Sequence, residues 1–185
     1  MGEIPKGWKV EILGQLCNNL DNLRKPLSEL ERKDMQGIYP YYGAMSIVDY
    51  VNDFIYEGIH LLLSEDGANV IDDKGHPALQ YIWGKFWVNN HAHVIQGNNI
   101  ISTEFLYLSL KETNVSHLVT GAAQPKINQQ NMNSIKLIVP NEECLSNFMK
   151  LIKELFSNYR NTEEINRQLI LLKEVIISKL ATIEN

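Results

Sequence analysis

Short apolar runs alternate with turn-rich segments through the first 140 residues. WKVEIL, GIHLLL, QYIWGKFWV, HAHVI and IKLIV have the length and the β-branched or aromatic content of strands. EDGAN, DDKGHP and QGNN separate them and are typical of turns. One helix is predicted from Ser102 or Thr103, either of which is a good N-cap, through EFLYLSLKET. Helical crossovers are too few for a doubly wound sheet, so residues 1–140 are predicted to form an α+β domain with antiparallel or mixed strands.

The spacing of apolar residues changes after Pro140. No glycine or proline follows up to Asn185, and apolar residues recur every three or four positions, which predicts a long amphipathic helix over residues 141–185. A step of six residues places Asn161 and Thr162 where the stripe should be apolar, and this shift predicts a kink, a break or two stacked helices with Thr162 as a new N-cap. The predicted stripe consists of Leu145, Phe148, Ile152, Leu155, Tyr159, Ile165, Leu169, Leu172, Ile176, Leu180 and Ile183.

This stripe is too long for a domain of about 140 residues to cover. An amphipathic helix of about 40 residues projects beyond such a domain and exposes its apolar side chains. The stripe therefore predicts pairing with a second helix, and we expect a homodimer in a coiled-coil-like arrangement. The alternative is a helix that folds back on its own domain.

Composition narrows the class of protein. Of 185 residues, 44% are hydrophobic and 21% are charged, which is near the average for globular domains and excludes a disordered chain. No apolar run approaches the roughly 18 residues that a membrane span needs, so we expect no membrane partner. Cys17 and Cys144 lack metal-ligand spacing, and MGEIPKGW lacks the pattern of a signal peptide. These features predict a reducing, cytoplasmic location.

The net charge of −5 argues against a nucleic-acid partner, but the charges are unevenly distributed. Residues 34–73 contain eight carboxylates and no lysine or arginine, whereas residues 113–140 contain no carboxylate. Such separation is typical of a protein with one face that tolerates anions, although blocks in a sequence need not map to faces. The carboxylate-free block includes the amide-rich stretch TGAAQPKINQQNM.

That stretch has the side chains of a DNA-contacting segment. Gln124 and Asn128 carry amides that can pair with adenine, and Lys126 can meet phosphate or guanine. Gly121 and the two alanines would let the backbone approach a duplex closely. A second cluster, YPYYGA, contains Tyr41 and Tyr42, which suit either stacking on bases or closing a small core. Both interpretations of these tyrosines stay open.

Motifs for catalysis are weak. The sequence contains no phosphate-binding GxxxxGK[ST], no dinucleotide GxGxxG after a strand and no GxSxG nucleophile elbow. His91 and His93 would share one face of a strand, and with the acids between Asp66 and Asp73 they favour a small metal-dependent hydrolase as an alternative function. No further ligand stands at a recognisable offset, so we predict no metal. EDGANVIDD lacks the ligand spacing of a calcium loop and is interpreted as a solvated acidic loop.

The order of several motifs identifies a family. GEIPKGWKVEILGQLC, YPYYGA, LLLSEDGANV, GKFWVNNHAHVI, TGAAQPKINQQNMNSIKLIVP and the terminal EINRQLILLKEVIISKLATIEN follow one another along the chain. Together they resemble the specificity subunit of type I restriction-modification systems over essentially the whole chain. In that family a target recognition domain reads one half of a split DNA sequence, and a long helical region serves as spacer and as packing surface for the methyltransferase subunits. The usual subunit has two of each region, whereas this chain has one, as in a half-subunit.

The resemblance implies a non-catalytic protein that positions methyltransferase and restriction subunits on double-stranded DNA at a bipartite site. S-adenosylmethionine and ATP would then be used only in partner subunits, and no cofactor is expected in this chain. TGAAQPKI corresponds to the family's recurrent segment before the last strand, which favours backbone contact and scaffolding over base readout. An adaptor that binds no DNA is the main alternative. The candidate DNA contacts are Tyr41, Tyr42, Asn89, Asn90, His91, Thr120, Gln124, Lys126 and Asn128.

Overall fold

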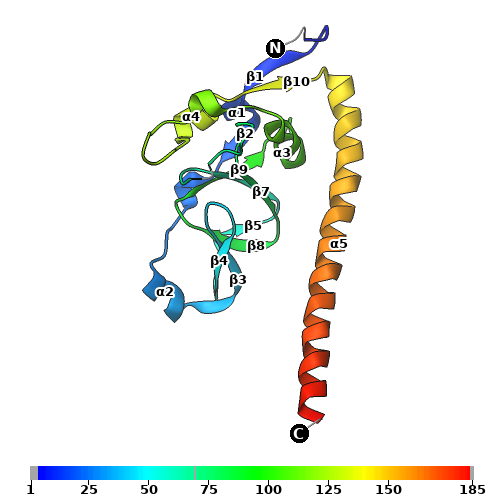
Figure 1. Cartoon of the computed structure of the whole chain (residues 1–185). Helices are drawn as coiled ribbons and strands as arrows, with labels where there is room; N and C mark the ends of the chain where they lie inside the picture. Colours follow the sequence, from blue (N-terminus) through cyan, green and yellow to red (C-terminus); the bar gives the residue numbers. More distant parts are fainter. Residues whose placement is uncertain (1–3, 69, 184–185) are drawn as a thin grey trace. The chain divides into compact units, whose positions relative to one another are not determined.

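The computed structural model describes residues 4–68 and 70–183 and divides into two compact units, Met1–Glu143 and Cys144–Asn185 (Figure 1). The predicted α+β class is confirmed: mixed strands and short helices fill the first unit, and one long helix forms the second. The described strands are β1 (Lys9–Ile12), β2 (Cys17–Asn19), β3 (Gln36–Tyr42), β4 (Ile47–Val51), β5 (Tyr56–Glu57), β6 (His60–Ser64), β7 (Leu79–Ile82), β8 (Lys85–Val88), β9 (Ala92–Gly97) and β10 (Lys136–Val139).

These strands form two four-stranded sheets and a two-stranded ribbon. One sheet has the order β2-β9-β6-β7 and is antiparallel throughout, and the other has the order β4-β3-β8-β5 with a parallel pair between β3 and β8. The ribbon pairs β1 with β10, so the start of the described chain is hydrogen-bonded to the strand that precedes the long helix (Figure 1).

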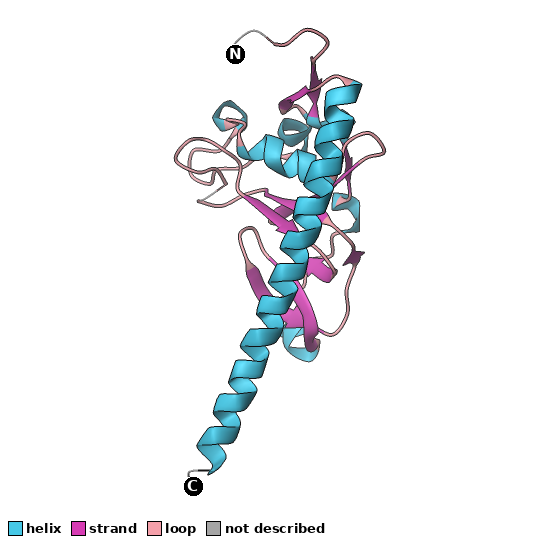
Figure 2. Ribbon diagram, turned by 90° about the vertical axis from the view of Figure 1, so that its right-hand side faces the viewer, coloured by secondary structure: helices cyan, strands magenta, loops and turns pink. Residues whose placement is uncertain are grey.

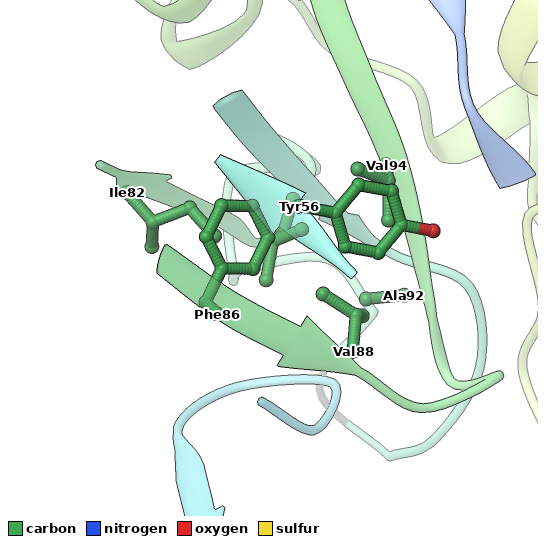
Figure 3. Packing of buried hydrophobic residues seen from close by; sticks show 7 residues of the cluster. Tyr56, Ile82, Phe86, Val88, Ala92 and Val94 are labelled. Carbon is green, nitrogen blue, oxygen red and sulfur yellow. The ribbon is translucent and has the colours of Figure 1, made fainter. Parts of the chain in front are cut away.

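One hydrophobic core cluster of the first unit combines side chains from both of the larger sheets. The Tyr56 and Phe86 rings stack with their centroids 5.2 Å apart, and Figure 3 shows them gathered with Val88, Ala92 and Val94. Each of these side chains is almost fully removed from water. HLLLS and AHVI are buried at every position, which fits their place in the inner strands β6 and β9 of one sheet.

The stretch QYIWGKFWV does not form one strand, and this prediction was wrong. β7 ends at Ile82 and β8 begins at Lys85, and the two strands belong to different sheets. Gly84 between them has φ +88°, a backbone conformation that glycine adopts at little cost. A single glycine therefore redirects the chain from one sheet into the other.

Short helices connect the strands of the first unit. The helix predicted after Ser102 is confirmed: the Ser102 hydroxyl accepts a hydrogen bond from the backbone N–H of Phe105. Ser28 begins another helix with a capping box, because Glu31 bonds back to the backbone N–H of Ser28. The described helices of this unit are α1 (Leu13–Leu16), η1 (Asp21–Leu23), α2 (Glu29–Asp34), α3 (Thr103–Lys111), η2 (Ser116–Leu118) and α4 (Gln129–Asn133).

The described residues of the second unit all belong to one helix, α5 (Glu142–Ile183), which is drawn without interruption in Figure 2. The predicted break near Asn161 and Thr162 is therefore wrong. The Thr162 hydroxyl donates to the Asn158 carbonyl at 2.9 Å, one turn back, which lets a polar residue sit inside the helix without acting as a cap. No helix within the described residues is long and apolar enough to cross a membrane.

Candidate nucleic-acid interface

The amide-rich stretch forms a closed loop at residues 120–126. The backbone N–H of Thr120 donates to the Lys126 carbonyl at 2.9 Å, and the Lys126 N–H donates back to the Thr120 carbonyl at 2.8 Å. Gly121 has φ +86°, and a Cβ at this position would collide with the Gln124 carbonyl oxygen. Residues 120–124 are exposed. The stretch is therefore an ordered loop that presents small and polar groups at its tip.

Glu65 and Asp66, directly after β6, hold this loop against the first unit. The N–H of Ile127 donates to the Glu65 carbonyl at 2.9 Å, and Asp66 forms an isolated bridge with Lys126. The Lys126 ammonium lies 2.9 Å from a carboxylate oxygen of Glu65 while its side chain remains 44% exposed. Ile127 is fully buried, so its side chain also anchors the end of the loop.

The turn at residues 89–91 joins the same surface. The Asn89 side chain accepts a hydrogen bond from the N–H of His91 at 2.8 Å, which closes the turn. His91 Nδ1 lies 2.8 Å from a carboxylate oxygen of Asp66, and the His91 carbonyl accepts a hydrogen bond from the N–H of Glu65. Glu65 and Asp66 therefore bring the 89–91 turn and the 120–126 loop together. Asn90 and His91 are exposed beside them.

Asn128 has a structural role. Its side chain accepts a hydrogen bond from the N–H of Asn131 at 2.8 Å and so caps α4, a helix that sequence reasoning missed. Asn131 in turn donates to the Leu118 carbonyl at 2.7 Å. The Asn128 side-chain oxygen and the Asn131 side-chain nitrogen are therefore engaged within the fold, and this part of the stretch supports the loop.

The two tyrosines lie in different environments. Tyr41 is 1% exposed, and its hydroxyl accepts a hydrogen bond from the buried backbone N–H of Leu27 at 2.9 Å. It belongs to the core, and this corrects its assignment as a DNA contact, because a buried ring does not meet a duplex. Tyr42 is half-buried against Phe86, and its carbonyl accepts a hydrogen bond from the N–H of Asn89. Tyr42 therefore supports the 89–91 turn through its backbone.

A cluster of charges that sequence reasoning missed lies beneath these loops. Arg24 donates to Glu65 at 2.6 Å and to the Ala92 carbonyl at 2.9 Å. Burial alone would raise the pKa of Glu65, but hydrogen bonds from Arg24 and Lys126 outweigh it and hold the pKa below its usual range. The separation of these residues along the chain leaves no local motif, so the cluster could only be found from the folded structure.

The two histidines do not form a metal site. His91 lies in the turn with a half-exposed side chain, whereas the His93 side chain is 1% exposed within β9, so the predicted shared face is wrong. Within residues 4–68 and 70–183, no three His, Cys, Asp or Glu side chains are arranged to hold a metal ion. The donor set that the metal-dependent hydrolase requires is not brought together in this part of the chain.

Most of the predicted stripe on α5 is exposed. Phe148, Leu155, Tyr159, Ile165, Leu169, Leu172, Ile176 and Leu180 are between 37% and 58% exposed. Leu145 and Ile152 are buried, and the side chain of Ile183 lies outside the described part of the structure. The helix thus carries a long apolar face from its second turn almost to its end.

Comparison with known proteins gives the family. The type I restriction modification DNA specificity domain matches residues 5–173, which is most of the chain. The chain belongs to this family. A putative type I restriction enzyme specificity subunit from Haemophilus influenzae is 32% identical over 148 residues, covering 80% of this chain and 37% of that protein. The EcoprrI specificity subunit from Escherichia coli is 29% identical over 114 residues, covering 62% of this chain and 27% of that protein.

The fold agrees with the sequence relationship. A crystal structure of the type I restriction-modification S subunit from M. genitalium matches with a TM-score of 0.61 at 14% identity, covering 91% of this chain and 44% of that chain. The resemblance to specificity subunits that the motif order indicated is therefore confirmed at the level of family and fold. The chain spans less than half the length of these curated relatives.

Proposed function

We propose that the chain is a DNA-recognition subunit of a type I restriction-modification complex and that its first unit reads one half of a bipartite site. The observation that carries this proposal is the membership of residues 5–173 in the specificity-domain family. The exposed polar surface formed by the 89–91 turn and the 120–126 loop supports it, because backbone amides, asparagine and glutamine suit contacts to phosphates and bases.

The 120–126 loop acts mainly on the DNA backbone in this proposal. Its tip consists of glycine, two alanines and Gln124, so the main chain can approach a duplex without obstruction by large side chains. Lys126 is paired with Glu65 but keeps 44% of its side chain in water, which leaves the ammonium able to meet a phosphate. The exposed polar side chains available here for base contacts include those of Thr120, Gln124, Asn90 and His91.

A homodimer through α5 would complete the bipartite reader. The exposed apolar face of α5 needs a partner helix, and a second copy of the chain related by a two-fold axis is the commonest solution for a soluble protein. Two identical recognition units would read identical half-sites, so the target is an inverted repeat with an unread spacer. The 42 residues of α5 span roughly 63 Å at 1.5 Å per residue, which bounds the separation of the half-sites.

Chemistry belongs to partner subunits in this proposal. Methyltransferase subunits would use S-adenosylmethionine and the restriction subunit would use ATP, with this chain placing both on the target DNA in the cytoplasm. The chain itself would supply position and sequence choice without a cofactor.

Duplex binding measured over a range of salt concentrations tests the proposal. The purified chain is expected to bind double-stranded DNA, with affinity that falls steeply as salt rises because phosphate contacts release counterions. A chain that is folded, dimeric and unable to bind any duplex at low salt would contradict the proposal and would leave a helical adaptor as the better account.

A further inference from the structure

His93 makes hydrogen bonds at both nitrogens of a fully buried ring. Nδ1 lies 2.6 Å from Oδ2 of Asp21, which belongs to η1. Nε2 lies 2.8 Å from the carbonyl oxygen of Ile127, the residue that directly follows the 120–126 loop. The ring therefore links two segments that are more than one hundred residues apart, through the strand β9 on which it stands.

Both of these partners accept hydrogen bonds. A backbone carbonyl has no hydrogen to give. Asp21 also accepts from the N–H of Val94 at 2.8 Å and from the amide of Asn19 at 3.2 Å, and Arg24 lies 3.5 Å away. Burial alone would raise the pKa of Asp21, but the bonds from His93 and Val94 outweigh it and hold the pKa below its usual range. An ionised carboxylate on one side and a carbonyl on the other require a hydrogen on each ring nitrogen.

We propose that His93 is a positioning residue that carries two ring protons and ties the 120–126 loop to the body of the recognition unit. Only the consequence for DNA binding, that the loop is held in place to contact the duplex, rests on the proposed function. A neutral ring has a single N–H and can satisfy one of the two acceptors. The second proton is what makes His93 a link between Asp21 and Ile127.

The charged groups around His93 stabilise a positively charged ring. Asp21 and Glu65 face it, the latter with a carboxylate oxygen 3.8 Å from Nδ1. Arg24 and Lys126 each bond Glu65, so five charged groups alternate in sign beneath the 120–126 loop. Two further titratable groups near Asp21 stay neutral: burial raises the pKa of Cys17 to about 11 and the pKa of Tyr56 to about 12. The two carboxylates thus oppose the imidazolium directly.

Nuclear magnetic resonance of protein labelled with 15N in its histidines tests the protonation state without DNA. At neutral pH the ring of His93 is expected to show two protonated nitrogens, each coupled to its own hydrogen. His76, which is partly buried and whose Nδ1 lies 3.1 Å from a carboxylate oxygen of Asp72, provides the comparison within the same sample. A ring of His93 with one protonated and one bare nitrogen would overturn the proposal.

Substitution tests the positioning role. His93→Gln cannot span both acceptors, so the backbone amides of Thr120 and Lys126 are expected to exchange with solvent about tenfold faster or more, as loss of charge-assisted hydrogen bonds predicts. His76→Gln is the matched control and should leave these amides unchanged. Unaltered exchange in a folded His93→Gln variant would overturn the proposal. If the His93→Gln variant does not fold, the protonation of the His93 ring in the natural chain decides the proposal by itself. If the natural chain fails to bind DNA, that result contradicts only the proposed function.

Discussion

Lys126 carries the one positive charge in the 113–133 segment and keeps it at the surface of the candidate interface. Its bond to Glu65 is half-exposed and contributes little to stability. Lys126→Gln should leave the fold intact, weaken duplex binding for all sequences, and lower the slope of log affinity against log salt by about one. Lys74→Gln, at an exposed position directly after the acidic EDGANVIDD segment, is the control. An unchanged salt slope would remove Lys126 from the contact surface.

Tyr41 contributes to stability in this account and makes no contact with DNA. Tyr41→Phe leaves the buried N–H of Leu27 without its partner and should lower the free energy of unfolding by about 1–3 kcal/mol. Tyr50→Phe, at a half-exposed position, should change it by less than about 0.5 kcal/mol. Urea unfolding measures both. If Tyr41→Phe weakens DNA binding while stability is retained, the core assignment is wrong.

The burial of His60 should make the stability of the first unit decrease as pH falls. Burial lowers the pKa of His60 from its ordinary value of 6.5, and only a bond to Gly58 opposes this shift. As pH falls below 6.5 the unfolded chain binds a proton that the folded chain does not, so stability should decrease until the folded-state pKa is reached. His60→Phe should flatten the decrease between pH 7 and pH 5, as urea unfolding can check. An equal decrease in both proteins would show that other groups cause it.

For single residues, the sequence shows which side chains are polar but does not show which of them are buried. Tyr41 and Tyr42 are neighbours of the same type, yet one is in the core and the other lies at the edge of the candidate interface. His91 and His93 differ in the same way. Burial depends on what the rest of the chain places over each residue, so spacing alone cannot decide it.

The 120–126 loop is the element on which the proposed DNA contact depends. Gly121→Ala puts a residue with a Cβ at a position where the backbone φ is +86°, and the Cβ would collide with the Gln124 carbonyl. This change should lower stability by about 1–2 kcal/mol and distort the loop. Gly84→Ala is the matched control, since φ there is +88° and no atom lies near the added Cβ. Both variants should melt earlier, but only Gly121→Ala should lose DNA affinity. Equal affinity of the two variants would contradict a role for the loop.

Helices with a regular spacing of apolar residues could be predicted from the sequence. Elements whose existence or boundary depends on a single residue could not. The helix after Ser102 and the helix over residues 141–185 followed from caps and apolar spacing. The division of QYIWGKFWV depended on a positive φ at Gly84, and α4 depended on a cap by Asn128 within a polar run. Conversely, the predicted break in α5 gave too much weight to Asn161 and Thr162, which an exposed helix accommodates at small cost.

At the scale of the whole molecule, the proposed dimer depends on α5. Leu169→Asp combined with Ile176→Asp should convert the proposed dimer into monomers, because both side chains lie on the exposed apolar stripe. Ser178→Asp, about 200° around the helix from Ile176, should leave the dimer intact. Analytical ultracentrifugation at tens of micromolar distinguishes these states. A natural chain that sediments as a monomer would contradict the proposed dimer.

The methylation pattern of DNA from cells that carry this chain with its methyltransferase subunits tests the central claim most directly. The account predicts that methylated adenines lie in an inverted repeat of two identical half-sites with a spacer of fixed length. It also predicts that the pattern disappears with the Leu169→Asp and Ile176→Asp pair of substitutions. DNA without new methylation, or with methylation at a site whose two halves differ, would contradict the account.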